Sequence, residues 1–139
     1  MQQRLIGLDI GDRRIGVAVC DMLRVAASPK EVYTRTGDDS ADIKYFVELF
    51  KSLNAEYFVI GMPLNMDGSR GFQSEKVLEF AKKLQDAGLK TVFIDERLST
   101  KSAERAMIEG NVRRDKRKKS IDSVAAALIL QNYLDSNTR

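Results

Sequence analysis

The sequence contains no histidine among its 139 residues, and this absence excludes several classes of active site. Without an imidazole the chain has no Ser/His/Asp triad, no Cys/His pair and no histidine-ligated zinc. Any phosphodiester hydrolysis must therefore use carboxylates, lysine, tyrosine or a metal-activated water.

Cysteine is nearly absent as well. Cys20 is the only one, so the chain can form no internal disulfide and offers no thiolate cluster for zinc. No apolar run approaches the roughly 20 residues of a membrane-spanning helix, and the N-terminus lacks the apolar stretch of a signal peptide. We therefore expect a protein of the reducing cytoplasm with no membrane partner.

Basic charge is concentrated in one place. The segment from Arg113 to Lys119 carries six basic residues and one acid, a net charge of +5, whereas the whole chain is only +3. The other residues therefore carry a net charge of −2. With 43% hydrophobic residues the chain can bury a sizeable core, and its length fits a single domain over residues 1–139.

The hydrophobic pattern predicts an α/β fold. Strands are expected at 4–10, 14–21, 24–33, 56–60 and 91–95, and helices at 39–53, 72–87, from Ser99 or Thr100 to near Gly110, and from an N-cap at Ser120 to about Leu134. The first strand is apolar on both faces, which favours a central position, whereas Pro29 favours an edge for the third. This order predicts a mixed five-stranded sheet, an antiparallel meander joined to parallel strands, with helices on both faces.

Carboxylates lie inside one apolar run, at the end of a second and at the start of a third. Asp9 shares its strand face with Leu5 and Gly7, where burial is expected, and an unpaired buried carboxylate costs several kcal/mol. Asp95 and Glu96 end the last strand. Because successive side chains point to opposite faces, at most one of the two shares a site with Asp9.

Asp122 opens the last helix in this interpretation, so it has a structural alternative. An acid in the first helical turn interacts favourably with the helix dipole. However, Asp122 borders the apolar stripe expected from Ile121, Val124, Ala125, Leu128 and Ile129, and small neighbours allow the helix to approach the sheet closely. If the fold brings Asp9, Asp122 and one acid of the last strand together, their oxygens suit Mg²⁺ or Mn²⁺.

Four motifs, in order and spread over essentially the whole chain, resemble one known family. They are Gly7-Leu8-Asp9-Ile10-Gly11 with Arg14-Ile15-Gly16-Val17-Ala18; Ile60-Gly61-Met62-Pro63-Leu64-Asn65-Met66-Asp67-Gly68; Asp95-Glu96-Arg97-Leu98-Ser99-Thr100; and Ile121-Asp122-Ser123-Val124-Ala125-Ala126. Together they closely resemble the YqgF family, also called Holliday-junction-resolvase-like proteins, to which processing of pre-16S ribosomal RNA is ascribed.

The resemblance implies an RNase H-like fold and Mg²⁺- or Mn²⁺-dependent nuclease chemistry in ribosome biogenesis. It assigns catalytic and metal-ligand roles to Asp9, Glu96 and Asp122, and so favours Glu96 over Asp95. Many RNase H-like nucleases carry four acidic ligands, whereas three can be placed here, which leaves one or two metal ions open. Nucleic acid is the implied partner, pre-16S rRNA first, with ribosomal particles as a further one.

Candidate substrate contacts are basic. Arg70 lies in a loop with several glycines that leads into a helix N-terminus, a place suited to phosphate. Arg97 follows Glu96 and could pair either with a substrate phosphate or with Asp95. The basic segment adds Arg113, Arg114, Lys116, Arg117, Lys118 and Lys119. It shows no apolar periodicity, so we expect an irregular stretch that contacts phosphates; the alternative is a solvated charge run with no binding role.

Other functions stay open on the sequence. The same site could resolve four-way DNA junctions, or the chain could be a non-catalytic RNA-binding or transcription-associated module. An actin-like or sugar-kinase-like nucleotide binder is disfavoured, because such proteins need two domains of this size. No apolar stripe stands out beyond those of the core, so we expect a monomer or at most a weak homodimer.

Overall fold

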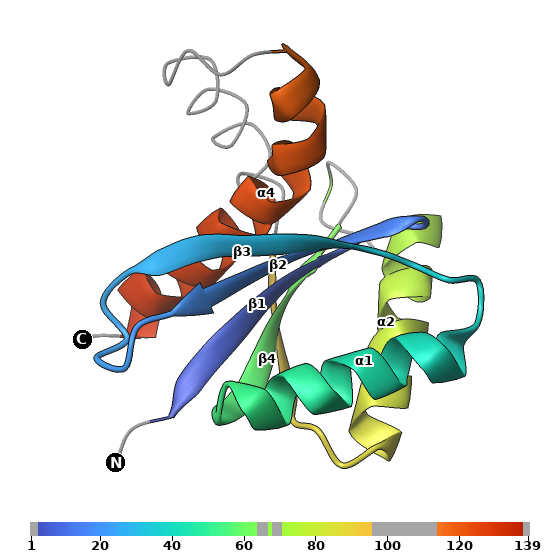
Figure 1. The fold of residues 1–139 in the computed structure, drawn as a ribbon, viewed down its shortest axis with the longest axis horizontal. Coiled ribbons are helices and arrows are strands. Elements are labelled where there is room, and N and C mark those ends of the chain that lie inside the picture. Colours follow the sequence, from blue (N-terminus) through green and yellow to red (C-terminus); the bar gives the residue numbers. More distant parts are fainter. Residues whose placement is uncertain (1–2, 64–66, 68–70, 96–113, 138–139) are drawn as a thin grey trace.

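Five strands form one mixed sheet in the order β3-β2-β1-β4-β5 (Figure 1). The computed structural model describes residues 3–63, 67, 71–95 and 114–137, with side chains from residue 122 to 136 in the last of these ranges. The strands are β1 (Arg4–Ile10), β2 (Arg14–Cys20), β3 (Ala27–Thr34), β4 (Ala55–Met62) and β5 (Thr91–Asp95). The first three pair antiparallel, and β4 runs parallel to both β1 and β5. The predicted mixed sheet is confirmed.

The positions of the strands follow from their residues. β1 is central, between β2 and β4, as its apolar character on both faces predicts. β3 lies at an edge, where Pro29 removes no ladder hydrogen bond that the sheet needs, and the β2–β3 register shifts between Val17 and Ala18, opposite this proline. β3 begins at Ala27, three residues later than expected.

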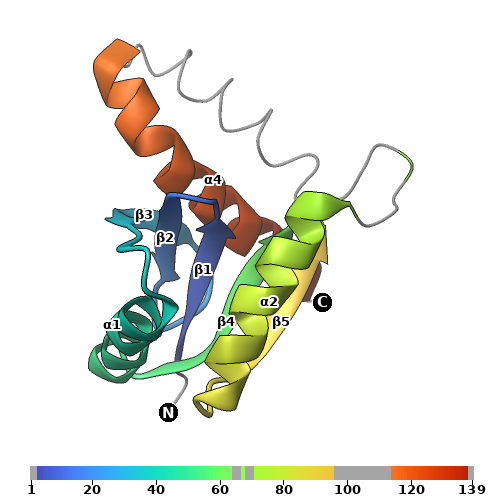
Figure 2. The same cartoon turned by 90° about the vertical axis from the view of Figure 1, so that its right-hand side faces the viewer.

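Three helices in the described part of the chain cover the two faces of the sheet. Figure 2 shows α1 (Asp39–Ser52) and α2 (Phe72–Asp86) on one face and α4 (Arg114–Asn137) on the other. Asp38 caps α1, because its side chain accepts a hydrogen bond from the Ser40 backbone N–H. Beyond α2, Gly88 adopts a φ of 90°, a left-handed conformation that ends the helix as its sequence predicts.

The core has two layers, one on each face of the sheet. Ile6, Leu8 and Ile10 of β1 point toward α1 and α2, where they pack in one cluster with Phe46 and Phe80. The alternate side chain of Leu5 packs on the α4 side in a second cluster. The odd-numbered residues of β1 therefore face α4.

Helix α4 lies directly on the backbone of β1 and β2. A Cβ at Gly7 would sit 2.8 Å from the Ala126 carbonyl oxygen and from Leu130 Cβ, and a Cβ at Gly16 only 1.9 Å from the Asp122 carbonyl oxygen. Real Cβ contacts are not shorter than about 3.0 Å. Both glycines are therefore required for this helix to approach the sheet so closely.

The start of α4 corrects three sequence predictions. The helix begins at Arg114, so Ser120 is interior and not its N-cap, and Asp122 lies two turns inside, where the helix dipole no longer explains it. The basic residues from 114 to 119 are helical and not irregular. The packed face also differs from the predicted stripe: Val124 and Leu128 are only partly buried, and the buried apolar residues are Ala125, Ala126, Ala127, Ile129, Leu130 and Leu134.

Of the other predicted helices, two can be compared with the structure and one cannot. α1 and α2 each end within one residue of the predicted boundary. The short helix expected from Ser99 or Thr100 to near Gly110 lies outside the described residues.

Candidate active site

Asp9 lies one residue before the end of β1, on the face covered by α4. Leu5 and Gly7 of the same strand contact the α4 layer, and alternation places Asp9 with them. Its side chain is half-buried. The predicted orientation of Asp9 is thereby confirmed.

Asp122 reaches the same place from α4. Gly16, which lies directly opposite Asp9 in the β1–β2 ladder, contacts the Asp122 backbone. The missing side chain at Gly16 therefore lets the helix deliver its carboxylate beside that of Asp9. Both acids line one pocket of about 190 Å³, together with the turn that joins β1 to β2.

Arg14 is a site residue that the sequence interpretation did not assign. Its Nε lies 3.5 Å from Asp122 Oδ2, and the two side chains are 51% and 31% exposed. An ion pair this open contributes little stability, at most about 1 kcal/mol. Arg14 belongs to the second half of the first motif, but nothing in its local sequence says that it points at a carboxylate from another element.

Asp95 faces away from this pocket. Val92 and Ile94 of β5 pack in the α4-side cluster, so Asp95, the next residue along the strand, points to the opposite face. Glu96, the predicted third ligand, lies outside the described residues, as do Arg70, Arg97 and Arg113. Within the part of the chain that is described, no cluster of three or more acidic, cysteine or histidine side chains could hold a metal ion.

The basic residues predicted to contact substrate lie on the same helix as Asp122. Arg114, Lys116, Arg117, Lys118 and Lys119 occupy the first two turns of α4. At a rise of 1.5 Å per residue, this stretch extends about 12 Å along the helix axis from Asp122. A phosphate backbone that contacts it would run toward the pocket.

Asp12 occupies the turn itself and has a partner on the other side of the sheet. Its Oδ1 accepts a hydrogen bond from Lys76 Nζ of α2 at 3.0 Å. This bond lowers the pKa of the Asp12 carboxyl below its ordinary value. This ion pair ties the turn between β1 and β2 to α2.

A family model described as "RuvX: Holliday junction resolvase" matches residues 3–136 of this chain. The chain belongs to the RuvX family. Its resemblance to the YqgF proteins is thereby confirmed. Proteins named "Putative pre-16S rRNA nuclease" are 44% identical in Clostridioides difficile and 46% identical in Caldanaerobacter subterraneus, over 95% and 96% of this chain and 94% and 96% of theirs.

Solved structures place this RuvX-family chain in the RNase H-like fold. The RuvC of Thermus thermophilus, solved alone and in a complex with a Holliday junction substrate, superposes with TM-scores of 0.58 and 0.57. Sequence identity is 14% and 17%, and the match covers at least 98% of each chain. In the described parts of the chain, no helix is both long enough and apolar enough to cross a membrane.

Proposed function

We propose that this protein is a divalent-metal-dependent nuclease that processes the 5′ end of pre-16S ribosomal RNA in the cytoplasm. The observation that carries the proposal is the shared pocket of Asp9 and Asp122, acids 113 positions apart that β1 and α4 deliver to one end of the sheet. Membership of the RuvX family and full-length relatives named as pre-16S rRNA nucleases support the same chemistry.

The donor set fits Mg²⁺ or Mn²⁺. Two carboxylates at a partly open pocket are hard oxygen ligands, and no described thiol or imidazole competes for a softer metal. Asp9 and Asp122 would hold the ion, with Glu96 proposed as the third ligand. When bound, the metal supplies an activated water and stabilises charge on the scissile phosphate.

The protein's own residues have separate tasks in this proposal. Asp9 is fixed on the central strand and Asp122 on a helix pressed against Gly16, so neither carboxylate needs to reorganise. Arg14 balances the charge of Asp122. The basic turns of α4, with Arg70, Arg97 and Arg113, are proposed to bind substrate phosphates, which would make affinity strongly dependent on salt.

A second candidate keeps the site and changes the substrate to a four-way DNA junction. The description of the family model as a Holliday junction resolvase favours it. Junction resolution requires two symmetric cuts, so this function would need a dimer on the substrate. Ribosomal particles are the proposed partners for the RNA function alone.

The decisive experiment compares both substrates with matched variants. Wild-type protein is incubated with Mg²⁺ or Mn²⁺ and labelled 5′-extended 16S rRNA fragments or four-way junctions, beside Asp9→Asn and Asp122→Asn. Asp135→Asn is the control, because Asp135 is an exposed acid on the same helix, 13 residues beyond Asp122, and accepts a hydrogen bond from Gln131.

We expect cleavage of the RNA by wild type and Asp135→Asn, and loss of cleavage in the two site variants. The same two site variants should also lose manganese binding, measured by calorimetry. Cleavage that survives Asp9→Asn or Asp122→Asn unchanged would refute the metal site. Cleavage of junctions alone would support the second candidate, and binding without cleavage under any metal would identify a non-catalytic module.

A further inference from the structure

The turn between β1 and β2 is closed by Gly11 and Arg14, with Asp12 and Arg13 at its tip. The Gly11 N–H donates to the Arg14 carbonyl at 2.9 Å. Two-residue hairpin loops normally adopt turns with a positive φ at the first tip residue, because those turns match the twist of the strands. Among the described residues positive φ occurs only at Arg24, Gly37, Asn54 and Gly88. The turn at Asp12 and Arg13 is therefore not one of these preferred types.

Arg35, the first residue after β3, holds this turn from outside. Its backbone N–H donates to the Arg13 carbonyl at 2.8 Å, and its guanidinium Nη1 donates to the Gly11 carbonyl, also at 2.8 Å. Arg35 thus binds the carbonyl of the tip residue Arg13 and that of Gly11, which precedes the tip. Gly11 is only two positions beyond Asp9, and Arg14 begins the strand that carries Gly16.

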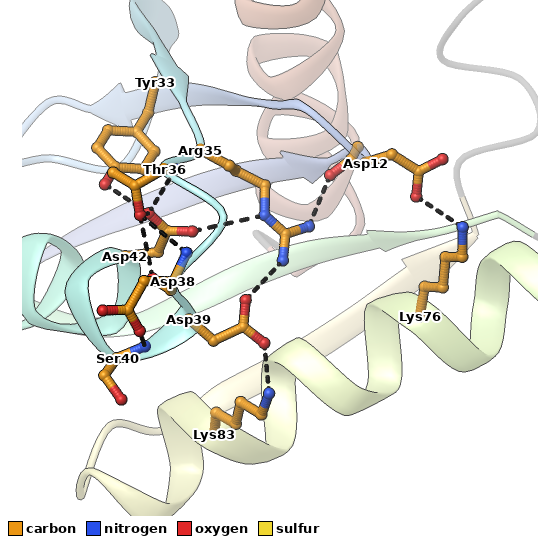
Figure 3. Close-up of polar contacts among 11 residues, drawn as sticks. Asp12, Tyr33, Arg35, Thr36, Asp38, Asp39, Ser40, Asp42, Lys76 and Lys83 are labelled. Carbon is orange, nitrogen blue, oxygen red and sulfur yellow. Dashed lines mark hydrogen bonds and ion pairs between the residues drawn. The ribbon is translucent and has the colours of Figure 1, made fainter.

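The guanidinium of Arg35 is itself fixed on three sides. Its Nη2 donates to Asp39 Oδ1 at 3.1 Å, its Nε lies 3.7 Å from Asp42 Oδ2, and its Cζ lies 4.9 Å from the centre of the Phe80 ring. The Arg35 side chain is 18% exposed, and that of Asp42 is 0% exposed. Figure 3 shows this group between the turn and the two helices.

The Asp42 carboxylate is itself fixed by hydrogen bonds to three groups. Its Oδ1 accepts hydrogen bonds from the Tyr33 hydroxyl at 2.8 Å, the Thr36 hydroxyl at 3.0 Å and the Thr36 backbone N–H at 3.1 Å. Its Oδ2 lacks a hydrogen bond within the described residues and faces the guanidinium. A buried carboxylate in this position demands a cation, so Arg35 is held in one place.

We propose that Arg35 is a positioning residue of the nuclease site, which fixes the Gly11–Arg13 turn and thereby the placement of Asp9 and Arg14 against Asp122. It touches neither carboxylate of the pocket. Its action is mechanical: Asp39 and the buried Asp42 of α1 hold the guanidinium, and the guanidinium holds the turn. This inference rests on the proposed function for its kinetic consequence, but its structural content is independent of that function.

Arg24 offers a matched control at the opposite end of the same sheet. It also donates to a backbone carbonyl, that of Gln3 at 2.8 Å, pairs with a carboxylate, that of Glu56, and lies over an aromatic ring, that of Tyr57. Its side chain is 21% exposed, close to the value for Arg35. Arg24→Gln and Arg35→Gln therefore remove similar sets of contacts, and only the second set includes the turn.

The test combines hydrogen exchange, manganese binding and steady-state kinetics on the full chain. In Arg35→Gln we expect faster exchange over residues 9–16, Mn²⁺ affinity weakened about tenfold or more, and kcat lowered on the order of tens of fold with KM little changed. Arg24→Gln should leave all three at wild-type values. Arg35→Lys, which keeps a cation beside Asp42 but can reach fewer acceptors, should restore part of the loss.

Unfolding of Arg35→Gln is a foreseeable complication, because it leaves the Asp42 charge buried alone. The double variant Arg35→Gln/Asp42→Asn avoids this, since an asparagine oxygen can still accept from Tyr33 and Thr36. Exchange over residues 9–16 equal in this variant and Arg24→Gln would overturn the proposal. If wild type neither binds Mn²⁺ nor cleaves, the proposed function fails, and the exchange comparison alone decides the role of Arg35.

Discussion

Adding a single methyl group at Gly16 should separate α4 from the sheet and disable the site. A Cβ at Gly16 would lie 1.9 Å from the Asp122 carbonyl oxygen and 2.3 Å from its carbonyl carbon. Both are backbone atoms, so no side chain can rotate away. The helix must retreat by about 1.1 Å before the shorter contact reaches 3.0 Å, the lower limit of real Cβ contacts.

A displacement of this size should lower both the stability of the protein and the rate of cleavage. Overpacking of this kind costs about 1–3 kcal/mol or more, which corresponds to a fall in Tm of roughly 3–10 °C for a domain of this size. A misplacement of about 1 Å at a reacting centre can cost about 100-fold in rate. Gly16→Ala should therefore lose most metal affinity and cleavage while it keeps its fold.

Two other glycines make this a graded test. At Gly7 the added Cβ would meet Ala126 and Leu130 at 2.8 Å, so a retreat of a few tenths of an ångström suffices. At Gly37 the Cβ would meet nothing within 4 Å, but the φ of 91° strains any other residue, at a cost of about 1–2 kcal/mol. Gly37→Ala should thus lose stability without losing the site.

The assays are urea unfolding, manganese calorimetry and cleavage, each run on all three variants. We expect metal affinity to fall most in Gly16→Ala, less in Gly7→Ala and not at all in Gly37→Ala. Wild-type metal affinity in a folded Gly16→Ala protein would show that contact between α4 and β2 does not position Asp122, and the steric reasoning would be wrong.

Three further predictions concern stability and binding. Tyr33→Phe removes a hydrogen bond to buried Asp42 and should lower the free energy of unfolding, measured in urea at neutral pH, by about 1–2 kcal/mol. Burial chiefly, and then that hydrogen bond, raise the pKa of Tyr33 from 10.0 to about 12. The stability that the Tyr33 hydroxyl contributes should therefore be lost between pH 10 and 12. The hydrogen bond from Lys83 is the main cause of the lowered pKa of Asp39, so Lys83→Met should raise that pKa. The stability that ionised Asp39 contributes is lost as the pH falls through its pKa, so the variant should lose it at a higher pH than wild type. Carboxyl NMR titration would measure the pKa directly. Replacing the six cations of residues 113–119 by glutamine should reduce the slope of log affinity against log salt by up to about 5 on duplex nucleic acid, and an unchanged slope would exclude this segment as the phosphate contact.

The local hydrophobic pattern was sufficient to predict most strands of the sheet. β1 and β5 match their predicted bounds, because continuous or alternating apolar runs bounded by turn residues have few other interpretations. Alternation along β1 also gave the correct face for Asp9. Glu96 over Asp95 came from the family resemblance, and the outward face of Asp95 agrees with that preference.

The beginning of α4 could not be found by the same reasoning. The prediction relied on apolar periodicity and on Ser120 as a cap, and the basic residues before it have no periodicity. Lysine and arginine are nevertheless good helix formers, so nothing in the segment opposes a helix. Arg35 was missed for another reason: its partners come from the β1–β2 turn, α1 and α2, and no local signal in the sequence connects them.

The two faces of the sheet constrain the site by different physical means. On the α4 face the constraint is steric, because backbone atoms of Asp122 fill the space left by the missing side chain of Gly16. On the opposite face it is hydrogen bonding, since Arg35 and Lys76 hold the turn against α1 and α2. Steric contact sets how far Asp122 lies from the sheet, whereas the hydrogen bonds set where the end of β1 lies beneath it. Neither constraint alone fixes the position of Asp9 relative to Asp122, so a nuclease centre at this turn requires both layers of the fold.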